Sequence, residues 1–373
     1  MRKINNSNNL PKGWRKVKLG EIADVKTGST DVKDAVEGGI YPLFDRSMEI
    51  KRSNKYLFDD TAIIIPGEGR DFIPRFFSGK FDLHQRAYAI FPHEKEVDPS
   101  YLYYAILKER DIFSQWAVGS TVKSLRMPII KSVDLLLPSL QEQKRIAEIL
   151  SAFDEKIELN NKINKTLEEM AQAIFKEWYG ESQRSKETKL QKAEDVFIFE
   201  KGIEPGSKYY SEAKKEDYIP FYRVRDLEKD GGTDVYIPKE IAGEKICKEN
   251  DVLISLDATV GRVKIGCNGA FSSGIRKVYS REGLIKNSFV YFWLKSPYVQ
   301  NTILEHASGT TILHAGSSIK YLKFLFNKEI IEKIQKIIDP IFSKILQLKA
   351  ENQTLATLRD LLLPKLMSGE IRV

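Results

Sequence analysis

The sequence LPSLQEQKRIAEILSAFDEKIELNNKINKTLEEMAQAIFKEW, residues 137–178, decides how this chain is organised. It opens with an S-x-x-E capping box, formed by Ser139 and Glu142, which signals the start of a helix. Apolar residues then recur in alternating steps of four and three. A period of 3.5 residues kept over about four heptads is typical of a coiled coil rather than of a helix on a globular core. The predicted seam residues are Ile146, Leu150, Phe153, Ile157, Asn164, Leu167 and Ile174.

The last segment of the chain repeats this pattern 188 residues later, with Asn327 in the capping position. Asn164 and Asn352 take the same seam position, where an asparagine either fixes the register or lies at a wet edge of the seam. Pro340 cannot donate a helical hydrogen bond, so we expect a kink or a delayed start near it. The second predicted seam consists of Ile334, Ile338, Ile341, Ile345, Asn352, Leu355 and Leu362.

The segments before the two helices also repeat. Asp60–Ile65 aligns with Asn250–Ser255, and Ala117–Val122 aligns with Ala307–Ile312. Short β-type runs alternate with turn residues in both, and a short helix is expected to begin at Asp98. We therefore predict an α+β fold, in which two mixed α/β domains in tandem are separated by two long helices that form an antiparallel coiled coil. The predicted boundaries are 1–138 and 181–326 for the domains, and 139–180 and 327–373 for the helices.

The positive charge is confined to the two predicted domains. The chain carries a formal net charge of +7, and the helical segments contribute none of it. Residues 1–138 hold 22 basic and 18 acidic side chains, and residues 181–326 hold 23 and 20. Two separate basic blocks favour a polyanionic partner such as double-stranded DNA. If each block reads one half of a two-part DNA target, the two half-sites should differ, because the blocks differ in sequence.

Motifs for chemistry are missing or explained by structure. Asp98–Tyr101 approaches the D-P-P-Y pattern of methyltransferases, but the aligned segment Lys286–Phe289 lacks it. Gly67–Arg70 is too short for a dinucleotide fingerprint, and no G-x-x-x-x-G-K-S/T occurs. The four histidines show no metal-ligand spacing. We expect a chain that is not an enzyme; the alternative is a coiled-coil adaptor protein with two interaction domains and no sequence-specific role on DNA, which leaves the charge unexplained.

Arginine reads guanine through paired hydrogen bonds, and basic side chains in loops also bind phosphate. We selected basic residues that lie next to turn residues in the two blocks. Arg86 and Arg276 coincide under the repeat. The candidate DNA-binding residues are Arg46, Arg70, Arg75, Arg86, Lys123, Arg126, Arg223, Arg225, Arg262, Arg276, Lys277 and His314.

Three stretches together resemble a known family. They are the Pro-x-Gly-Trp opening at Pro11, the segment LPSLQEQKRIAEILSAFDEKI at residues 137–157, and the end LRDLLLPKLMSGEIRV at residues 358–373. They are similar to the specificity (S) subunit of type I restriction–modification systems over the whole chain. The resemblance implies two DNA target-recognition domains, with the helices as the spacer between the half-sites.

The resemblance also implies partners and a division of chemistry. Two modification (methyltransferase) subunits would bring S-adenosylmethionine, and restriction (translocase and nuclease) subunits would bring ATP and Mg²⁺. This chain would hold no cofactor and no metal of its own. The absence of an apolar run long enough for a membrane helix, and the two cysteines without C-x-x-C spacing, lead us to expect a cytoplasmic protein.

Overall fold

The computed structural model describes residues 10–69, 72–119, 122–228, 232–309 and 313–373. The chain divides into two compact units. Unit 1 is Met1–Lys156 with Leu355–Val373, and unit 2 is Ile157–Thr354. Each unit therefore combines one of the repeated blocks with part of each long helix.

Unit 1 is built on a six-stranded sheet with the order β2-β7-β5-β6-β3-β4. Neighbouring strands are antiparallel except β3 and β6, which are parallel. Strands β1 and β8 form a separate antiparallel pair. The strands are β1 (Arg15–Lys18), β2 (Ala23–Thr27), β3 (Tyr41–Phe44), β4 (Lys51–Ser53), β5 (Phe58–Pro66), β6 (Arg75–Leu83), β7 (Ala87–Pro92) and β8 (Asp134–Leu137). The helices are α1 (Leu19–Ile22), η1 (Val32–Asp34), α2 (Pro99–Lys108), α3 (Arg110–Trp116) and α4 (Met127–Lys131).

Unit 2 carries two four-stranded sheets, with the orders β10-β18-β14-β16 and β12-β11-β17-β13. Two further pairs, β15-β19 and β20-β9, complete it. The strands are β9 (Lys189–Lys192), β10 (Phe197–Lys201), β11 (Tyr218–Tyr222), β12 (Tyr236–Pro238), β13 (Ile246–Cys247), β14 (Val252–Ser255), β15 (Asp257–Ala258), β16 (Val263–Lys264), β17 (Gly269–Phe271), β18 (Ile275–Ser280), β19 (Leu313–His314) and β20 (Lys323–Phe326). The helices are α6 (Ala193–Val196), η2 (Ser207–Tyr209), η3 (Val224–Leu227), α7 (Lys239–Ala242), α8 (Asn287–Leu294), α9 (Pro297–Glu305) and η4 (Gly316–Tyr321).

The two units repeat one backbone plan. The parallel pair β3–β6 of unit 1 corresponds to the parallel pair β11–β17 of unit 2. A glycine lies at the same place in both, because a Cβ at Gly28 would come within 1.8 Å of the Leu83 carbonyl oxygen, and one at Gly202 within 2.2 Å of that of Phe271. The predicted α+β class, with two similar domains in tandem, is confirmed. The short helix predicted from Asp98 is α2, and the Asp98 side chain caps it by accepting from the Tyr101 amide.

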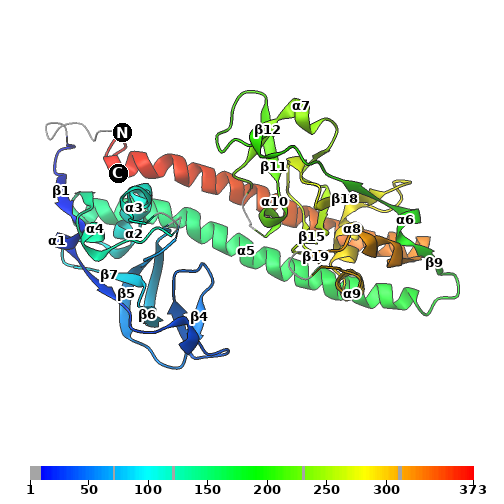
Figure 1. Ribbon diagram of the computed structural model, residues 1–373, viewed down its shortest axis with the longest axis horizontal. Coiled ribbons are helices and arrows are strands. Elements are labelled where there is room, and N and C mark those ends of the chain that lie inside the picture. The colour runs from blue at the N-terminus through cyan, green and yellow to red at the C-terminus, as the bar shows by residue number, and fades with distance from the viewer. Residues whose placement is uncertain (1–9, 70–71, 120–121, 229–231, 310–312) are drawn as a thin grey trace. The chain divides into compact units, whose positions relative to one another are not determined.

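The two long helices are α5 (Leu140–Ser182) and α10 (Lys328–Ser368), which Figure 1 shows in green and in orange to red. Of the two alternatives predicted at Pro340, a kink or a delayed start, the delayed start is not observed, because α10 begins at Lys328 and continues through Pro340. Helix α10 ends before the predicted residue 373, because Gly369 has a φ of +70° and its amide donates to the Leu366 carbonyl.

The helices pair antiparallel, as predicted. Arg359 forms an ion pair with Asp154 in unit 1, and in unit 2 Asn160 Nδ2 donates to Asn352 Oδ1 at 2.9 Å. The residue of α10 that lies further along the chain therefore contacts the residue of α5 that lies earlier, which means that the two helices run in opposite directions. All predicted seam residues are buried or half-buried, with Ile146, Leu150, Ile334, Ile338 and Ile345 fully enclosed. Both helices pack into the core of each unit, where Ile146 and Leu366 contribute to unit 1, and Phe175 and Ile334 to unit 2.

The seam asparagines do not face each other. Asn352 contacts Asn160 and Asn161, because residues at equal repeat positions are not opposite one another in an antiparallel pair. Asn164 is 6% exposed, and within the described residues neither of its amide atoms has a hydrogen-bond partner.

Replacing Asn164 with Leu should therefore stabilise unit 2. A buried polar group without a partner costs about 1–3 kcal/mol, and leucine at a seam position adds apolar burial. We expect the midpoint of urea denaturation to rise in Asn164→Leu and to fall in the matched variant Asn160→Leu, which breaks the bond to Asn352. A lower midpoint in both variants would contradict this prediction.

Each unit also holds helix α5 through a tyrosine hydroxyl. Tyr104 donates to Asp154 at 2.6 Å in unit 1, and Tyr291 donates to Glu168 at 2.7 Å in unit 2. Glu168 also pairs with Lys295. Burial alone would raise the pKa of Glu168, but Lys295 and Tyr291 lower it overall.

A lowered carboxyl pKa makes the stability of unit 2 dependent on pH. The contribution of Glu168 is complete above the ordinary glutamate pKa of 4.5 and is lost as the pH falls through the lower pKa of the folded state. We expect Glu168→Gln to cost about 1 kcal/mol at pH 7 and to flatten the loss of stability between pH 5 and pH 3. The neighbouring variant Glu169→Gln, which removes an exposed charge, should keep the wild-type slope; an unchanged slope in Glu168→Gln would contradict the assignment.

In the part of the chain that the structure describes, no helix is both long enough and apolar enough to cross a membrane.

Candidate nucleic-acid interface

Three segments of unit 1 meet just beyond the end of β5, at Gly67, Arg86 and Leu125, and we call this place the crossing. It brings together several of the predicted DNA-binding residues. The Gly67 amide donates to the Arg86 carbonyl at 2.8 Å, and the Leu125 amide donates to the Gly67 carbonyl at 2.8 Å. The loop that contains Lys123 closes on itself through paired bonds between Val118 and Ser124. A Cβ at Gly67 would lie 2.5 Å from the Arg86 carbonyl oxygen, so only glycine fits there.

Glu68 lies at the centre of this crossing. Arg86 Nη1 is 3.0 and 3.1 Å from its two carboxylate oxygens, and Arg46 Nη1 is 3.0 Å from one of them. The Glu68 side chain is 16% exposed, whereas those of Arg46 and Arg86 are more than half exposed. Burial alone would raise the pKa of Glu68, but the two guanidinium groups lower it overall.

Unit 2 builds the same crossing at the equivalent positions. The Leu256 amide donates to the Gly274 carbonyl at 2.8 Å, and the Ala315 amide donates to the Leu256 carbonyl at 2.7 Å. Ser308 and His314 exchange the paired bonds that Val118 and Ser124 make in unit 1. The predicted equivalence of the loops near residues 119 and 309 therefore extends to their hydrogen bonds.

A carboxylate again lies at the centre of the unit 2 crossing. Asp257 Oδ1 is 2.8 Å from Nδ1 of His314, whose side chain is 62% exposed. Arg276 lies nearby but turns inward, and its Nη1 donates to the carbonyls of Ser273 and Ile275 at 2.6 and 3.0 Å. Burial lowers the pKa of Arg276, although the charge of Asp257 opposes this effect.

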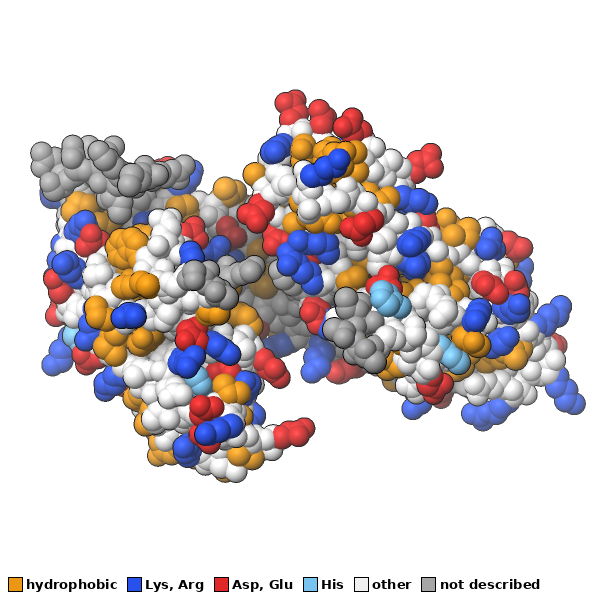
Figure 2. Space-filling view, viewed as in Figure 1, with side chains coloured by type: hydrophobic (Ala, Val, Ile, Leu, Met, Phe, Trp, Pro, Cys, Tyr) orange, Lys and Arg blue, Asp and Glu red, His pale blue; other side chains and the backbone are white. Residues whose placement is uncertain are grey.

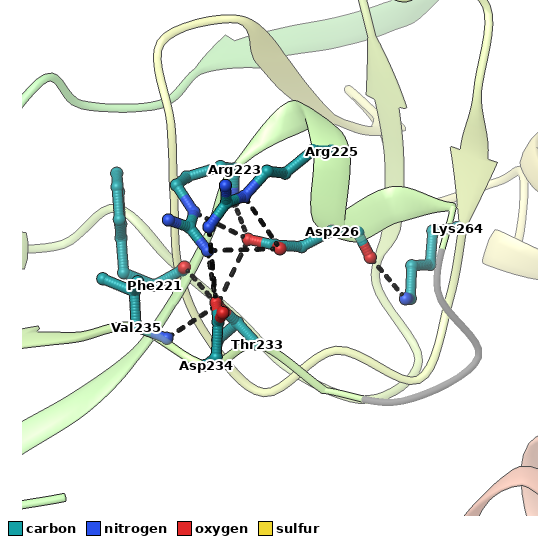
Figure 3. Close-up of polar contacts among 8 residues, drawn as sticks. All are labelled: Phe221, Arg223, Arg225, Asp226, Thr233, Asp234, Val235 and Lys264. Atoms are coloured by element: carbon teal, nitrogen blue, oxygen red, sulfur yellow. Dashed lines mark hydrogen bonds and ion pairs between the residues drawn. The ribbon is translucent and has the colours of Figure 1, made fainter. Parts of the chain in front are cut away.

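A second charged cluster in unit 2 surrounds Asp226, as Figure 3 shows. The Asp226 side chain is fully buried and accepts from Arg223 Nε at 3.0 Å and from Thr233 Oγ1 at 3.2 Å. Arg223 also pairs with Asp234 and therefore serves the fold. Arg225 is 60% exposed and lies 3.7 and 3.8 Å from the two aspartates, so it presents its guanidinium at the surface.

The other candidates divide by exposure. Lys277 is 15% exposed and pairs with Glu200 at 2.8 Å. Arg75 is half-buried over the Phe44 ring, with Nη2 on the Ser47 carbonyl, and Arg262 pairs with Glu228. These side chains would have to break internal contacts to reach DNA. Arg70 lies outside the described residues. The exposed candidates are Arg46, Arg86, Lys123, Arg126, Arg225 and His314.

The mixture of charges at the surface agrees with the pairing of basic side chains with carboxylates described above. Figure 2 shows Lys and Arg side chains interspersed with Asp and Glu on the face in view, rather than gathered in one continuous basic patch. Glu68 and Asp257 were not among the predicted site residues. The only sequence signal near them was the Gly67–Arg70 stretch, in which Gly67 marks a close approach of two backbones.

A family model described as "Type I restriction modification DNA specificity domain" matches residues 11–169 and, a second time, residues 186–357. The chain belongs to this family. The two matches correspond to the two halves of the repeat. The predicted family is thus confirmed.

Related specificity subunits match along most of their length. That of the type I restriction enzyme MjaIX from Methanocaldococcus jannaschii is 25% identical over 98% of this chain and 95% of its own. That of HindI from Haemophilus influenzae is 24% identical, over 83% of this chain and 85% of its own. The crystal structure of the type I S subunit from M. genitalium shares the fold, with a TM-score of 0.60 and 22% identity over 98% of both chains. Membership of the type I specificity family supports the predicted recognition subunit with two recognition domains, rather than a catalytic subunit or the adaptor alternative.

Proposed function

We propose that this chain reads an asymmetric two-part sequence in double-stranded DNA, one half through each unit, with the paired helices setting the gap. The observation that carries the proposal is the crossing that both units build with the same backbone hydrogen bonds but different exposed side chains. Unit 1 presents Arg46 and Arg86 there, and unit 2 presents His314. The same scaffold with different readers favours two different half-sites.

We further propose that two modification subunits and the restriction subunits assemble on this chain in the cytoplasm. S-adenosylmethionine would be bound by the modification subunits, and ATP and Mg²⁺ by the restriction subunits, so that this chain holds no cofactor. The support is the family, whose relatives are named as specificity subunits of type I restriction enzymes.

The proposal is tested by sequencing adenine methylation in the source genome with the gene for this chain intact or deleted. We expect one asymmetric motif of two parts with a fixed gap, and its loss on deletion. The purified chain alone should methylate nothing. A methylome that does not change on deletion would contradict the proposal, and methylation by the chain alone would overturn its role as a recognition subunit.

A further inference from the structure

We propose that Glu68 and Asp257 are positioning residues, which hold the DNA-reading side chains of their units (Arg46 and Arg86, and His314) through one nitrogen of each and leave the rest of each side chain for DNA. The inference rests on the proposed function and names the residues that orient its readers.

In unit 1 the contacts with Glu68 leave hydrogen-bond donors of Arg46 and Arg86 available for DNA. Arg86 and Arg46 both contact Glu68 through Nη1 alone. Within the described residues, Nε and Nη2 of both arginines make no hydrogen bond. These two groups form one edge of the guanidinium plane, and two parallel donors are what paired recognition of guanine or phosphate requires. An arginine fixed at Nη1 therefore offers its remaining edge in one orientation, with less rotamer freedom to lose on binding.

The geometry in unit 2 follows the same rule with a different side chain. Asp257 contacts Nδ1 of His314, which leaves Nε2 at the exposed end of the ring. The two carboxylates also take the same place in the fold. Glu68 bridges Ser124, and Asp257 pairs with His314, the residue at the position equivalent to Ser124. The carboxylate is common to both crossings, whereas the side chain that it holds and the segment that carries this side chain differ.

Stability alone does not explain why these contacts lie at the surface. The Glu68 and Asp257 side chains are 16% and 31% exposed, but Arg46, Arg86 and His314 are each more than half exposed, so solvent screens the contribution of these contacts to folding. A carboxylate on a surface that faces DNA also repels phosphate, so it lowers affinity unless it performs another task. Orientation of the reader is a task that accounts for a carboxylate at the same place in both units.

The test uses the full chain in complex with its modification subunits, and a pool of random-sequence duplexes as the probe. We compare Glu68→Gln and Asp257→Asn with two matched controls, Glu37→Gln in unit 1 and Glu282→Gln in unit 2. Both control residues are exposed, and neither makes an ion pair within the described residues. Duplexes retained by each complex are sequenced, and binding to a non-target duplex is measured in parallel.

We expect each substitution at a positioning residue to lower discrimination in one half-site about tenfold and to leave the other half-site unchanged. The two variants should affect opposite half-sites. Binding to the non-target duplex should not fall, because a negative charge has been removed. The controls should select the wild-type motif. A role in folding alone would instead lower specific and non-specific binding together.

A double-mutant cycle gives a second readout. If Glu68 acts through Arg46 and Arg86, then Glu68→Gln should add nothing further to the double variant Arg46→Ala with Arg86→Ala, whereas additive effects would overturn the proposal. An unchanged motif in Glu68→Gln, or loss of both half-sites together, would also overturn it. If the wild-type complex selects no motif at all, the proposed function itself fails, and this outcome is distinct from the others.

Discussion

Inserting one heptad at matched points of α5 and α10 is expected to abolish modification of the natural target and to create activity on a target with a longer gap. Seven residues at 1.5 Å each add about 10 Å of helix, which equals roughly three base pairs of duplex. The insertion keeps the 3.5-residue period, so the seam on both sides stays in phase. Suitable points follow Asn161 in α5 and precede Asn352 in α10, where the two helices are in contact.

The controls separate a change of spacing from damage to the helices. A heptad inserted into α5 alone shifts one seam against the other, so it should destabilise the chain and abolish modification of every target. Two residues inserted into both helices rotate the following seam residues by more than half a turn, so the seams no longer face each other, and this variant should behave in the same way. The measurement is the adenine methylation motif in cells that carry each variant. An unchanged gap in the double heptad variant would refute the role of the helices as a spacer.

The helices could be predicted because their signal is local. Ile146, Leu150, Ile334 and Ile338 recur with one period, and this period alone predicts which face is buried. The partner of each seam residue could not be predicted, because register depends on both helices together. Asn352 consequently meets Asn160 and Asn161 rather than the residue that the repeat makes its equivalent.

The candidate DNA-binding site could be predicted less well than the helices, because it also depends on contacts between distant parts of the chain. The predicted equivalence of Arg86 and Arg276 is wrong, because the Leu256 amide donates to the Gly274 carbonyl where the Gly67 amide donates to that of Arg86. Arg276 instead takes the strand position of Tyr88, and it donates to internal carbonyls whereas Arg86 is exposed. Whether a basic side chain turns inward depends on neighbours that are distant in the chain. The carboxylates Glu68 and Asp257 were missed because a search for DNA-binding residues selects cations. Their role depends on three segments that only the fold brings together.

Replacing Arg359 with Ala is expected to produce the largest loss of stability of any single substitution considered above. Arg359 Nη1 contacts Asp154, and the same carboxylate accepts from Tyr104 of α2 at 2.6 Å. Burial alone would lower the pKa of Arg359, but Asp154 and Asp360 hold it above its ordinary value, so the guanidinium stays charged. Its removal leaves Asp154, which is 31% exposed and still accepts from Tyr104, without its cation, at a cost of about 2 kcal/mol.

The cost arises from the unpaired carboxylate rather than from the loss of an attraction, and a second variant distinguishes the two. Asp154→Asn with Arg359→Met replaces the pair by neutral groups of similar size, and such replacements of enclosed ion pairs are often tolerated. We therefore expect the double variant to be more stable than Arg359→Ala alone. Amide hydrogen exchange in α2 and in the last turns of α10 reports unit 1 by itself, where the single variant should lose protection. Equal losses in the two variants would show that the contacts of Arg359 matter and the orphaned charge does not.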